Sequence, residues 1–198
     1  MTLQVVVLAS GAGSLCKALI DARDGTFAVQ AIVTDVPSAG VLQHAVAAGI
    51  EHRVVELANF SDREEWNEAL AGAIEEFHPD LVVSAGFMRV LGSAVLDAFP
   101  NRIINTHPAL LPAFPGAHAV RDALAAGVAE TGSTVHVIDA GVDTGPVLVQ
   151  EPVAILPDDD EATLHERIKA VERRLLVQVV RTIATHGLTV HDGKASLA

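Results

Sequence analysis

The sequence is poor in cysteine and in positive charge. Its 198 residues include one cysteine, Cys16, which excludes an intramolecular disulfide and a cysteine-based zinc cluster. Lys and Arg number 13 against 25 Asp and Glu, so the formal net charge is −12 at pH 7. Negative charge of this size repels phosphate backbones and acidic lipids, which disfavours a nucleic acid or a membrane surface as partner.

Long apolar segments are missing as well. The longest obvious apolar run, Val5 to Ala9, is far shorter than the roughly 20 residues of a membrane-spanning helix. No Lys or Arg precedes Lys17, so the basic start of a secretory signal is missing, and we expect a cytoplasmic protein. Half of the residues are hydrophobic, which excludes disorder or a coiled coil as the main state. Without a repeat or linker, the chain is expected to form one domain over residues 1–198.

Short apolar runs alternate with helical patterns through the first half of the chain. Leu3 to Ala9 is continuously apolar and rich in Val, as in a strand buried on both faces of a parallel sheet. In the second half, two strand patterns are joined by a Gly-rich turn, Asp139 to Gly145, which predicts an antiparallel pair. The sequence therefore predicts an α/β fold: a single-domain, Rossmann-like, open, mostly parallel twisted sheet with helices on both faces and an antiparallel addition in the C-terminal half.

The individual elements follow from the same patterns. The expected strands are Leu3–Ala9, Phe27–Val33, a short one within Ile50–Leu57, Leu81–Val83, Arg102–Thr106, Thr134–Ile138 and Val147–Val153. The expected helices are Leu15–Ala22, Val41–Ala48, one from Ser61 to Pro79, Val120–Ala126 and a long one after Asp158, Asp159 and Asp160. Ser61 and Glu64 have the spacing of a capping box, so Ser61 is expected to begin its helix.

The turn from Ser10 to Ser14 is the first candidate site. It lies between a predicted strand and a predicted helix, and its glycines allow close approach of an oxyanion to backbone amides. The spacing of Gly11 and Gly13 lacks the third glycine of a dinucleotide fingerprint, because Cys16 occupies that place. A tight turn without a ligand is the structural alternative.

The second candidate is the run Asn105-Thr106-His107-Pro108 at the end of a predicted strand, where open α/β sheets place ligands. Asn can donate a hydrogen bond to an oxygen, and an imidazole can donate or accept a proton near neutral pH. The alternative is a structural histidine beside a strand-end asparagine. The segment from Pro112 to Gly116 is expected to form a stiff, uncharged wall beside this run.

Two further features carry ionisable groups. Asp143 lies between Gly141 and Pro146, where a carboxylate either forms a turn or orients an imidazole or a water. Lys169 and Glu172 are three residues apart on the long helix, where the simpler interpretation is a solvated ion pair. Several histidines show no metal-ligand spacing and are assigned no chemistry: His44, His52, His78, His165, His186 and His191.

Four segments in order resemble the phosphoribosylglycinamide formyltransferase family, folate-dependent enzymes of purine synthesis. The resemblance runs from about Leu3 to Thr185 and rests on Ser10-Gly11-Ala12-Gly13-Ser14, Ala85-Gly86-Phe87-Met88-Arg89-Val90-Leu91, Asn105-Thr106-His107-Pro108-Ala109-Leu110-Leu111-Pro112 and Asp143-Thr144-Gly145-Pro146. Methionyl-tRNA formyltransferases and formyltetrahydrofolate deformylases share the Asn-x-His-Pro and late Asp pattern. The first usually add a C-terminal barrel and the second an N-terminal regulatory domain. We expect neither here, because the catalytic pattern begins at Leu3 and few residues follow it, and the acidic balance also disfavours tRNA.

The resemblance implies an activity and a set of site residues. The implied reaction moves a formyl group from 10-formyltetrahydrofolate, as co-substrate, to the amine of phosphoribosylglycinamide, with small molecules as partners and no metal. The implied catalytic residues are Asn105, His107 and Asp143. The implied ribonucleotide-binding residues are Gly13, Ser14 and Leu15 with Lys169 at the phosphate, and Glu172 at the ribose hydroxyls. The implied folate-binding residues are Arg63, Met88, Arg89, Val90, Leu91, Asn105, Ile138, Asp139, Ala140, Gly141, Val142 and Asp143.

One departure and three alternatives accompany this assignment. Many family members have Asn where this chain has Leu15, so a side-chain contact to the phosphate is lost while the backbone amide remains. Formyl transfer to water, as in a deformylase, and a non-catalytic nucleotide-binding module are the alternatives to transfer. A nicotinamide dehydrogenase is disfavoured by the missing glycine and because Asp35, the acidic residue after the second strand, is close to Pro37. The sequence sets no oligomeric state, and a homodimer is compatible with it.

Overall fold

The structure, a computed structural model, describes residues 1–197. The strands of its main sheet are β1 (Leu3–Leu8), β2 (Phe27–Thr34), β3 (Glu51–Val54), β4 (Leu81–Ser84), β5 (Ile103–His107), β6 (Glu130–Val137) and β7 (Val147–Ala154). The helices are α1 (Ser14–Asp21), α2 (Val41–Ala48), α3 (Arg63–Glu75), α4 (Ser93–Ala98), α5 (Ala119–Ala126) and α6 (Glu161–His186), with a 3₁₀ turn at Leu57–Asn59. A separate hairpin, β8 (Leu188–His191) and β9 (Lys194–Leu197), ends the described chain.

The main sheet has the predicted class of topology. Its seven strands lie in the order β3-β2-β1-β4-β5-β6-β7. The strands from β3 to β5 pair in parallel, whereas β6 and β7 are antiparallel to their neighbours. The prediction of an open, mostly parallel sheet with an antiparallel addition is therefore confirmed.

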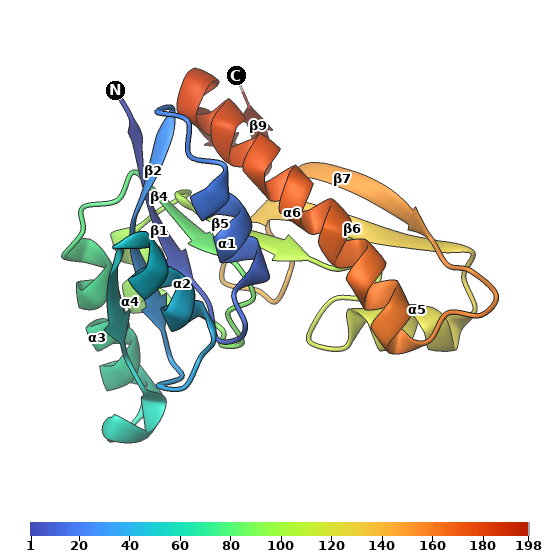
Figure 1. The fold of residues 1–198 in the computed structure, drawn as a ribbon, viewed down its shortest axis with the longest axis horizontal. Coiled ribbons are helices and arrows are strands. Elements are labelled where there is room, and N and C mark those ends of the chain that lie inside the picture. Colours follow the sequence, from blue (N-terminus) through green and yellow to red (C-terminus); the bar gives the residue numbers. More distant parts are fainter. Residues whose placement is uncertain (198) are drawn as a thin grey trace.

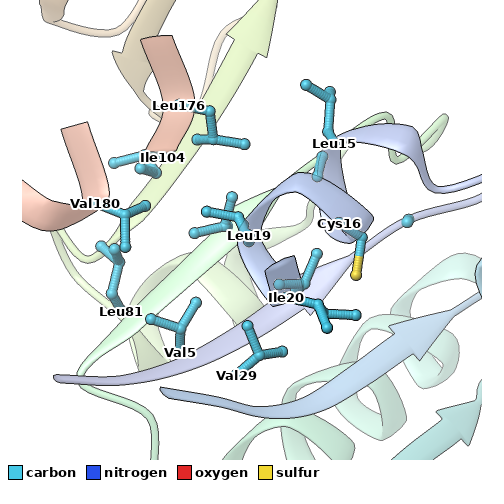
Figure 2. Packing of buried hydrophobic residues seen from close by; sticks show 14 of the residues in the cluster. Val5, Leu15, Cys16, Leu19, Ile20, Val29, Leu81, Ile104, Leu176 and Val180 are labelled. Carbon is cyan, nitrogen blue, oxygen red and sulfur yellow. The ribbon is translucent and has the colours of Figure 1, made fainter. Parts of the chain in front are cut away.

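Helices cover both faces of the sheet, as the alternating pattern predicts (Figure 1). On one face α1, α2 and α6 pack on a core that includes alternate β1 residues such as Val5 and Val7. Leu19 and Val180, from α1 and α6, meet in this layer (Figure 2). On the other face α3 and α4 cover a second core that includes Val6 and the buried Trp66. Because successive β1 residues face opposite layers, this strand must be apolar throughout.

The start of α3 differs from the prediction. Ser61 does not cap the helix; Asp62 is the N-cap, and its carboxylate accepts hydrogen bonds from the backbone amides of Glu64 and Glu65 at 2.9 Å. Ser61 instead donates its backbone N–H and its hydroxyl to the carboxylate of Glu65. A carboxylate caps strongly because it also complements the positive helix terminus, so Asp62 takes the place that the spacing gave to Ser61.

Two other boundaries differ by several residues: β6 begins at Glu130 instead of Thr134, and α3 ends at Glu75, before Pro79. The 3₁₀ turn at Leu57–Asn59 had no prediction. The short helix α4 and the hairpin β8–β9 were not expected from the sequence. Among the described residues, no helix is both long and apolar enough to cross a membrane.

The topology sets where a ligand can bind. The strand order reverses at β1, which pairs with β2 on one side and with β4 on the other. In open α/β sheets, ligands bind outside the carboxyl ends of the strands at such a reversal. The turn from Ser10 to Ser14, the segment after β4 and the end of β5 lie at these carboxyl ends. A backbone hydrogen bond of 3.1 Å from Ser10 N to the Gly86 carbonyl joins the first two.

Candidate active site

Strands β5 and β6 place three polar side chains together. Asn105 of β5 and His136 of β6 are paired residues of the antiparallel ladder, and their side chains meet with 3.2 Å between Asn105 Nδ2 and His136 Nε2. His107, two residues after Asn105 on the same strand, points to the same face of the sheet. Both histidines are buried. The ladder register thus builds a polar cluster at the end of the sheet.

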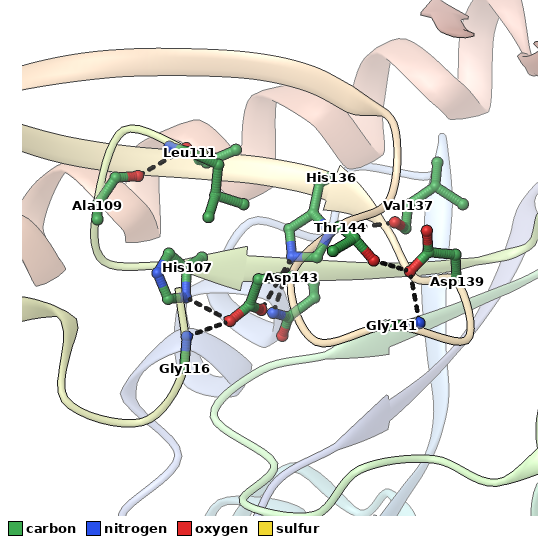
Figure 3. Close-up of polar contacts among 12 residues, drawn as sticks. His107, Ala109, Leu111, Gly116, His136, Val137, Asp139, Gly141, Asp143 and Thr144 are labelled. Atoms are coloured by element: carbon green, nitrogen blue, oxygen red, sulfur yellow. Dashed lines mark hydrogen bonds and ion pairs between the residues drawn. The ribbon is translucent and has the colours of Figure 1, made fainter. Parts of the chain in front are cut away.

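Asp143 completes this cluster from the loop between β6 and β7 (Figure 3). Its Oδ2 lies 3.3 Å from His107 Nδ1 and accepts a 2.7 Å hydrogen bond from Gly116 N, while its Oδ1 lies 3.5 Å from His136 Nε2. The three predicted catalytic residues, Asn105, His107 and Asp143, therefore converge, with His136 linking the amide to the carboxylate.

The loop that carries Asp143 is fixed by its own hydrogen bonds. Asp139 Oδ1 accepts hydrogen bonds from Gly141 N at 3.0 Å and from Thr144 Oγ1 at 2.7 Å. Asp143 has a φ of 55°, a left-handed conformation that costs energy for a residue with a side chain. At Gly145 an added Cβ would collide with the Val137 carbonyl oxygen, so glycine is required there. The strained backbone at Asp143 thus directs its carboxylate toward the imidazoles of His107 and His136.

The surroundings of His107 favour a ring with two N–H groups. His107 Nε2 lies 2.7 Å from the Phe114 carbonyl oxygen, which accepts a hydrogen bond only from a protonated nitrogen. The other ring nitrogen faces the Asp143 carboxylate. Both neighbours are acceptors, so an imidazolium satisfies them together. Phe114 and Gly116 both belong to the segment from Pro112 to Gly116, which holds the catalytic cluster from one side.

Asp143 is ionised at neutral pH. A hydrogen bond from His136 is the largest cause that lowers the pKa of this carboxyl below its ordinary value, and the Gly116 amide and the charge of His107 act in the same direction. Partial burial opposes them by raising the pKa, without reversing the net shift. A persistent negative charge at this point stabilises a positive charge on His107.

The cluster lies in a cavity of about 310 Å³. The predicted folate residues Met88, Arg89, Val90, Leu91, Ile138, Asp139, Gly141 and Val142 line it together with Asn105, His107 and Asp143. Met88, Val90 and Val142 are exposed apolar side chains, as expected of walls that an aromatic ligand would cover. Ala140 and Arg63 are not among the lining residues; Arg63 instead donates from Nη2 to the Val90 carbonyl at 2.8 Å.

The turn before α1 offers free backbone amides. Gly13 is the N-cap residue with a φ of 77°, and no side chain caps the helix. A Cβ at Gly13 would come within 2.5 Å of Val41 Cγ2, so the close packing of this turn against Val41 requires glycine. Ser14 is exposed, whereas the side chain of Leu15 is buried in the core. The Leu15 side chain is therefore not available to a ligand, and the contact of its backbone amide with a phosphate stays a prediction.

Lys169 and Glu172 are not the solvated ion pair of the simpler interpretation. Lys169 Nζ is 2.9 Å from Glu166 Oε1 on the same helix, while Glu172 is buried. Burial raises the pKa of the Glu172 carboxyl to about 7, and the Thr106 hydrogen bond and the charges of Lys169 and Arg173 oppose this rise. A buried carboxyl of this kind indicates a function more strongly than an exposed one.

His136 is the main site residue that the sequence reasoning missed. The available signal was the alternation around Thr134 and His136, which places both side chains on one face of a strand, here the strand beside Asn105. The cavity is also lined by His118, Glu161 and His165, the last of which had been assigned no chemistry. No group of three or more His, Cys, Asp or Glu side chains in residues 1–197 is arranged to hold a metal ion.

Comparison with known proteins identifies the family. The sequence profile described as "Formyl transferase" matches residues 3–180. This chain belongs to the formyl transferase family.

Individual members are similar over nearly the whole chain. The phosphoribosylglycinamide formyltransferase of Mycobacterium tuberculosis is 53% identical over 195 residues, which cover 98% of this chain and 91% of that protein. The enzyme of the same name from Escherichia coli is 36% identical, with 98% and 93% covered. The crystal structure of glycinamide ribonucleotide transformylase 1 from Symbiobacterium toebii matches with a TM-score of 0.95 at 36% identity and covers 99% of this chain and 94% of its own. These formyl transferases also bear out the predicted fold.

Proposed function

We propose that this formyl transferase moves the formyl group of 10-formyltetrahydrofolate to the amine of phosphoribosylglycinamide, a step of purine biosynthesis. The observation that carries the proposal is the convergence of an amide, an imidazole and a carboxylate in one cavity at the end of β5. The names of the similar proteins supply the acceptor. We further propose that residues 1–198 work as one formyltransferase domain in the cytoplasm.

The reaction needs a stabilised tetrahedral intermediate. The amine nitrogen attacks the formyl carbon and forms a C–N bond, and the formyl oxygen gains negative charge. The Asn105 amide nitrogen carries two N–H groups, so it can donate one to this oxygen. His107 can donate from Nε2 once this nitrogen turns from the Phe114 carbonyl oxygen, its partner in the structure, to the substrate oxygen. Collapse then breaks the bond between the formyl carbon and the folate nitrogen. Loss of one donor to such an oxyanion costs about 100- to 1000-fold in rate.

Asp143 holds His107 in its protonated form and orientation. A water held by this carboxylate can carry the proton from the attacking amine to the departing folate nitrogen. No covalent intermediate with the enzyme is required, since the amine itself is the nucleophile. Holding both substrates against the same cluster supplies the remaining acceleration by proximity.

The ribonucleotide binds between α1 and α6 in this proposal. Its phosphate accepts hydrogen bonds from the amides of Gly13, Ser14 and Leu15, and Lys169 turns from Glu166 to the same anion. Glu172, a buried residue of α6, accepts hydrogen bonds from the ribose hydroxyls. These contacts are local donors and acceptors, which a chain with a net charge of −12 requires for an anionic substrate.

The folate binds in the 310 Å³ cavity. Its pterin meets main-chain groups of residues 138–143, and the exposed apolar side chains of Met88 and Val90 cover its rings. Arg63 and Arg89 provide the positive charge for the carboxylates of its glutamate tail.

An acceptor-dependence assay tests the proposal. Purified protein is mixed with 10-formyltetrahydrofolate in the presence and in the absence of phosphoribosylglycinamide, and tetrahydrofolate formation is followed. We expect product only when the ribonucleotide is present. Equal turnover without it would assign the activity to a hydrolase, and no turnover in either mixture would contradict catalysis.

A further inference from the structure

Asp35 is a buried carboxylate that the proposed mechanism does not use. It follows β2 directly, and 1% of its side chain is exposed. A buried carboxylate is costly unless its oxygens are hydrogen-bonded to partners. Its Oδ1 accepts a 2.5 Å hydrogen bond from Ser10 Oγ, and its Oδ2 accepts one of 2.7 Å from Arg89 Nε.

Both partners belong to segments that bind substrate in the proposed function. Ser10 begins the turn that leads to Gly13 and Ser14, and Arg89 lies in the folate segment after β4. Ser10 Oγ also accepts a 2.9 Å hydrogen bond from Met88 N, and Ser10 N donates to the Gly86 carbonyl. One carboxylate thus joins the ribonucleotide turn to the folate segment at the point where the strand order reverses.

The contact with Asp35 also fixes the orientation of the Arg89 guanidinium. The guanidinium is a planar fork, so fixing Nε fixes the plane and the direction of both terminal nitrogens. The Arg89 side chain is 40% exposed and lines the cavity. Within residues 1–197, Asp35 is its only ion-pair partner. This ion pair uses Nε, and in residues 1–197 neither terminal nitrogen of Arg89 has an ion-pair partner.

We propose that Asp35 is a positioning residue, which holds the Arg89 guanidinium and the Ser10 hydroxyl so that the folate segment is pre-formed against the ribonucleotide turn. This inference rests on the proposed function for the identity of the two substrates. It also explains the acidic residue at the end of the second strand. In a dinucleotide-binding fold such a carboxylate binds a ribose, whereas here both oxygens are already engaged within the protein.

The substitution Asp35→Asn tests the proposal with little change of shape. The amide oxygen can still accept from Ser10, but an N–H group then faces the N–H of Arg89. We expect the Kd for tetrahydrofolate, measured by calorimetry, to rise about ten-fold, because a hydrogen bond to a charged group is lost. The KM for 10-formyltetrahydrofolate rises equally, while kcat changes less than about two-fold.

A second variant, Ser10→Ala, breaks the same network from the other partner. It removes the bridge between Asp35 and the Met88 amide and creates only a small void. We expect it to weaken tetrahydrofolate binding as well, and its effect and that of Asp35→Asn to be less than additive in the double variant. If Asp35→Asn fails to fold, the Ser10→Ala measurement decides alone.

The matched control is Asp159→Asn. Asp159 is similarly buried, with 4% of its side chain exposed, and is paired with Arg167 at 2.7 Å outside the cavity lining. We expect Asp159→Asn to lower the free energy of unfolding without changing the Kd for tetrahydrofolate. Wild-type tetrahydrofolate affinity in Asp35→Asn and Ser10→Ala would overturn the proposal, as would an equal loss of affinity in Asp159→Asn. Because binding of tetrahydrofolate needs no turnover, this result is independent of whether the wild-type protein transfers formyl groups.

Discussion

The Asp143 carboxylate lies between two imidazole rings and a backbone amide, and this environment defines its role. The contacts with His136, Gly116 and His107 keep the pKa of Asp143 low, so the charge persists at neutral pH. The negative charge of Asp143 stabilises a positive charge on the His107 ring, which a neutral side chain of the same shape would not do. The site depends on this one charge at least as much as on its shape.

We expect Asp143→Asn and His107→Ala to nearly abolish transfer, by at least about 100-fold in kcat, while the fold is retained. The first removes the charge that supports the imidazolium, and the second removes an oxyanion donor. Steady-state kinetics with circular dichroism as the check on folding measures both effects. The exposed Asp97, changed to Asn, is the control for loss of one acidic charge. Turnover near the wild-type rate in either site variant would refute the assigned roles.

Lys169 is expected to act in binding rather than in chemistry. In the structure the Lys169 amine is paired with Glu166. A bound phosphate can replace Glu166 as the partner of this amine. Lys169→Ala should raise the KM for phosphoribosylglycinamide about ten-fold and change kcat less than about two-fold, because a phosphate contact is made equally in ground and transition states. Lys17→Ala removes another lysine, paired with Asp21, and should leave both constants unchanged. A drop in kcat at constant KM would remove Lys169 from the phosphate site.

At the scale of the helix, the start of α3 distinguishes two caps. Asp62 accepts hydrogen bonds from two backbone amides of the first turn, whereas Ser61 accepts none from that turn. Asp62→Ala should therefore lower the free energy of unfolding by about 1 kcal/mol, and Ser61→Ala by clearly less. Urea denaturation of the two variants beside the wild type measures the difference. A larger effect at Ser61 would restore the capping box that the sequence spacing predicts.

The strands of the main sheet and most helices were predictable because local patterns determine them. The apolar run of β1 and the helical spacing in α6 reflect burial on two faces and on one face, respectively. The cap of α3 was not predictable in this way, since Ser61 and Asp62 are both good N-caps and the choice depends on where the chain enters the helix. The helix α4 has only six residues, too few for periodicity to reveal.

The site was predicted in part for a similar reason. Asn105 and His107 are close in sequence, so their shared strand face follows from spacing alone. The involvement of His136 depends on the register between β5 and β6, and that of Asp35 on the neighbouring ends of β1, β2 and β4. Such pairings arise from tertiary structure, which no single stretch of sequence contains.

At the scale of the whole molecule, one buried carboxyl links protonation to folding. The unfolded chain releases the Glu172 proton near pH 4.5, whereas the folded protein retains it until about pH 7. Between these values the folded state binds more protons, so Glu172 makes stability fall as the pH rises through this window. The burial that prepares Glu172 for the ribonucleotide therefore costs stability at neutral pH.

Glu172→Gln should remove this dependence, because the amide does not ionise. We expect the free energy of unfolding of the wild type, relative to the variant, to fall between about pH 4.5 and about pH 7, by on the order of 3 kcal/mol at most. Urea denaturation of both proteins across this range is the measurement. Parallel pH profiles of the two proteins would show that Glu172 ionises in the folded state as readily as in the unfolded chain.

The central claim is that the cluster at the end of β5 transfers a formyl group to an amine. Its most direct test follows the label from 10-formyltetrahydrofolate that carries ¹⁴C in the formyl group, in the presence of phosphoribosylglycinamide. We predict that the label appears in the formylated ribonucleotide in the wild type and remains on the folate in Asp143→Asn. Label released by the wild type as formate, or transferred at an undiminished rate by Asp143→Asn, would contradict the account.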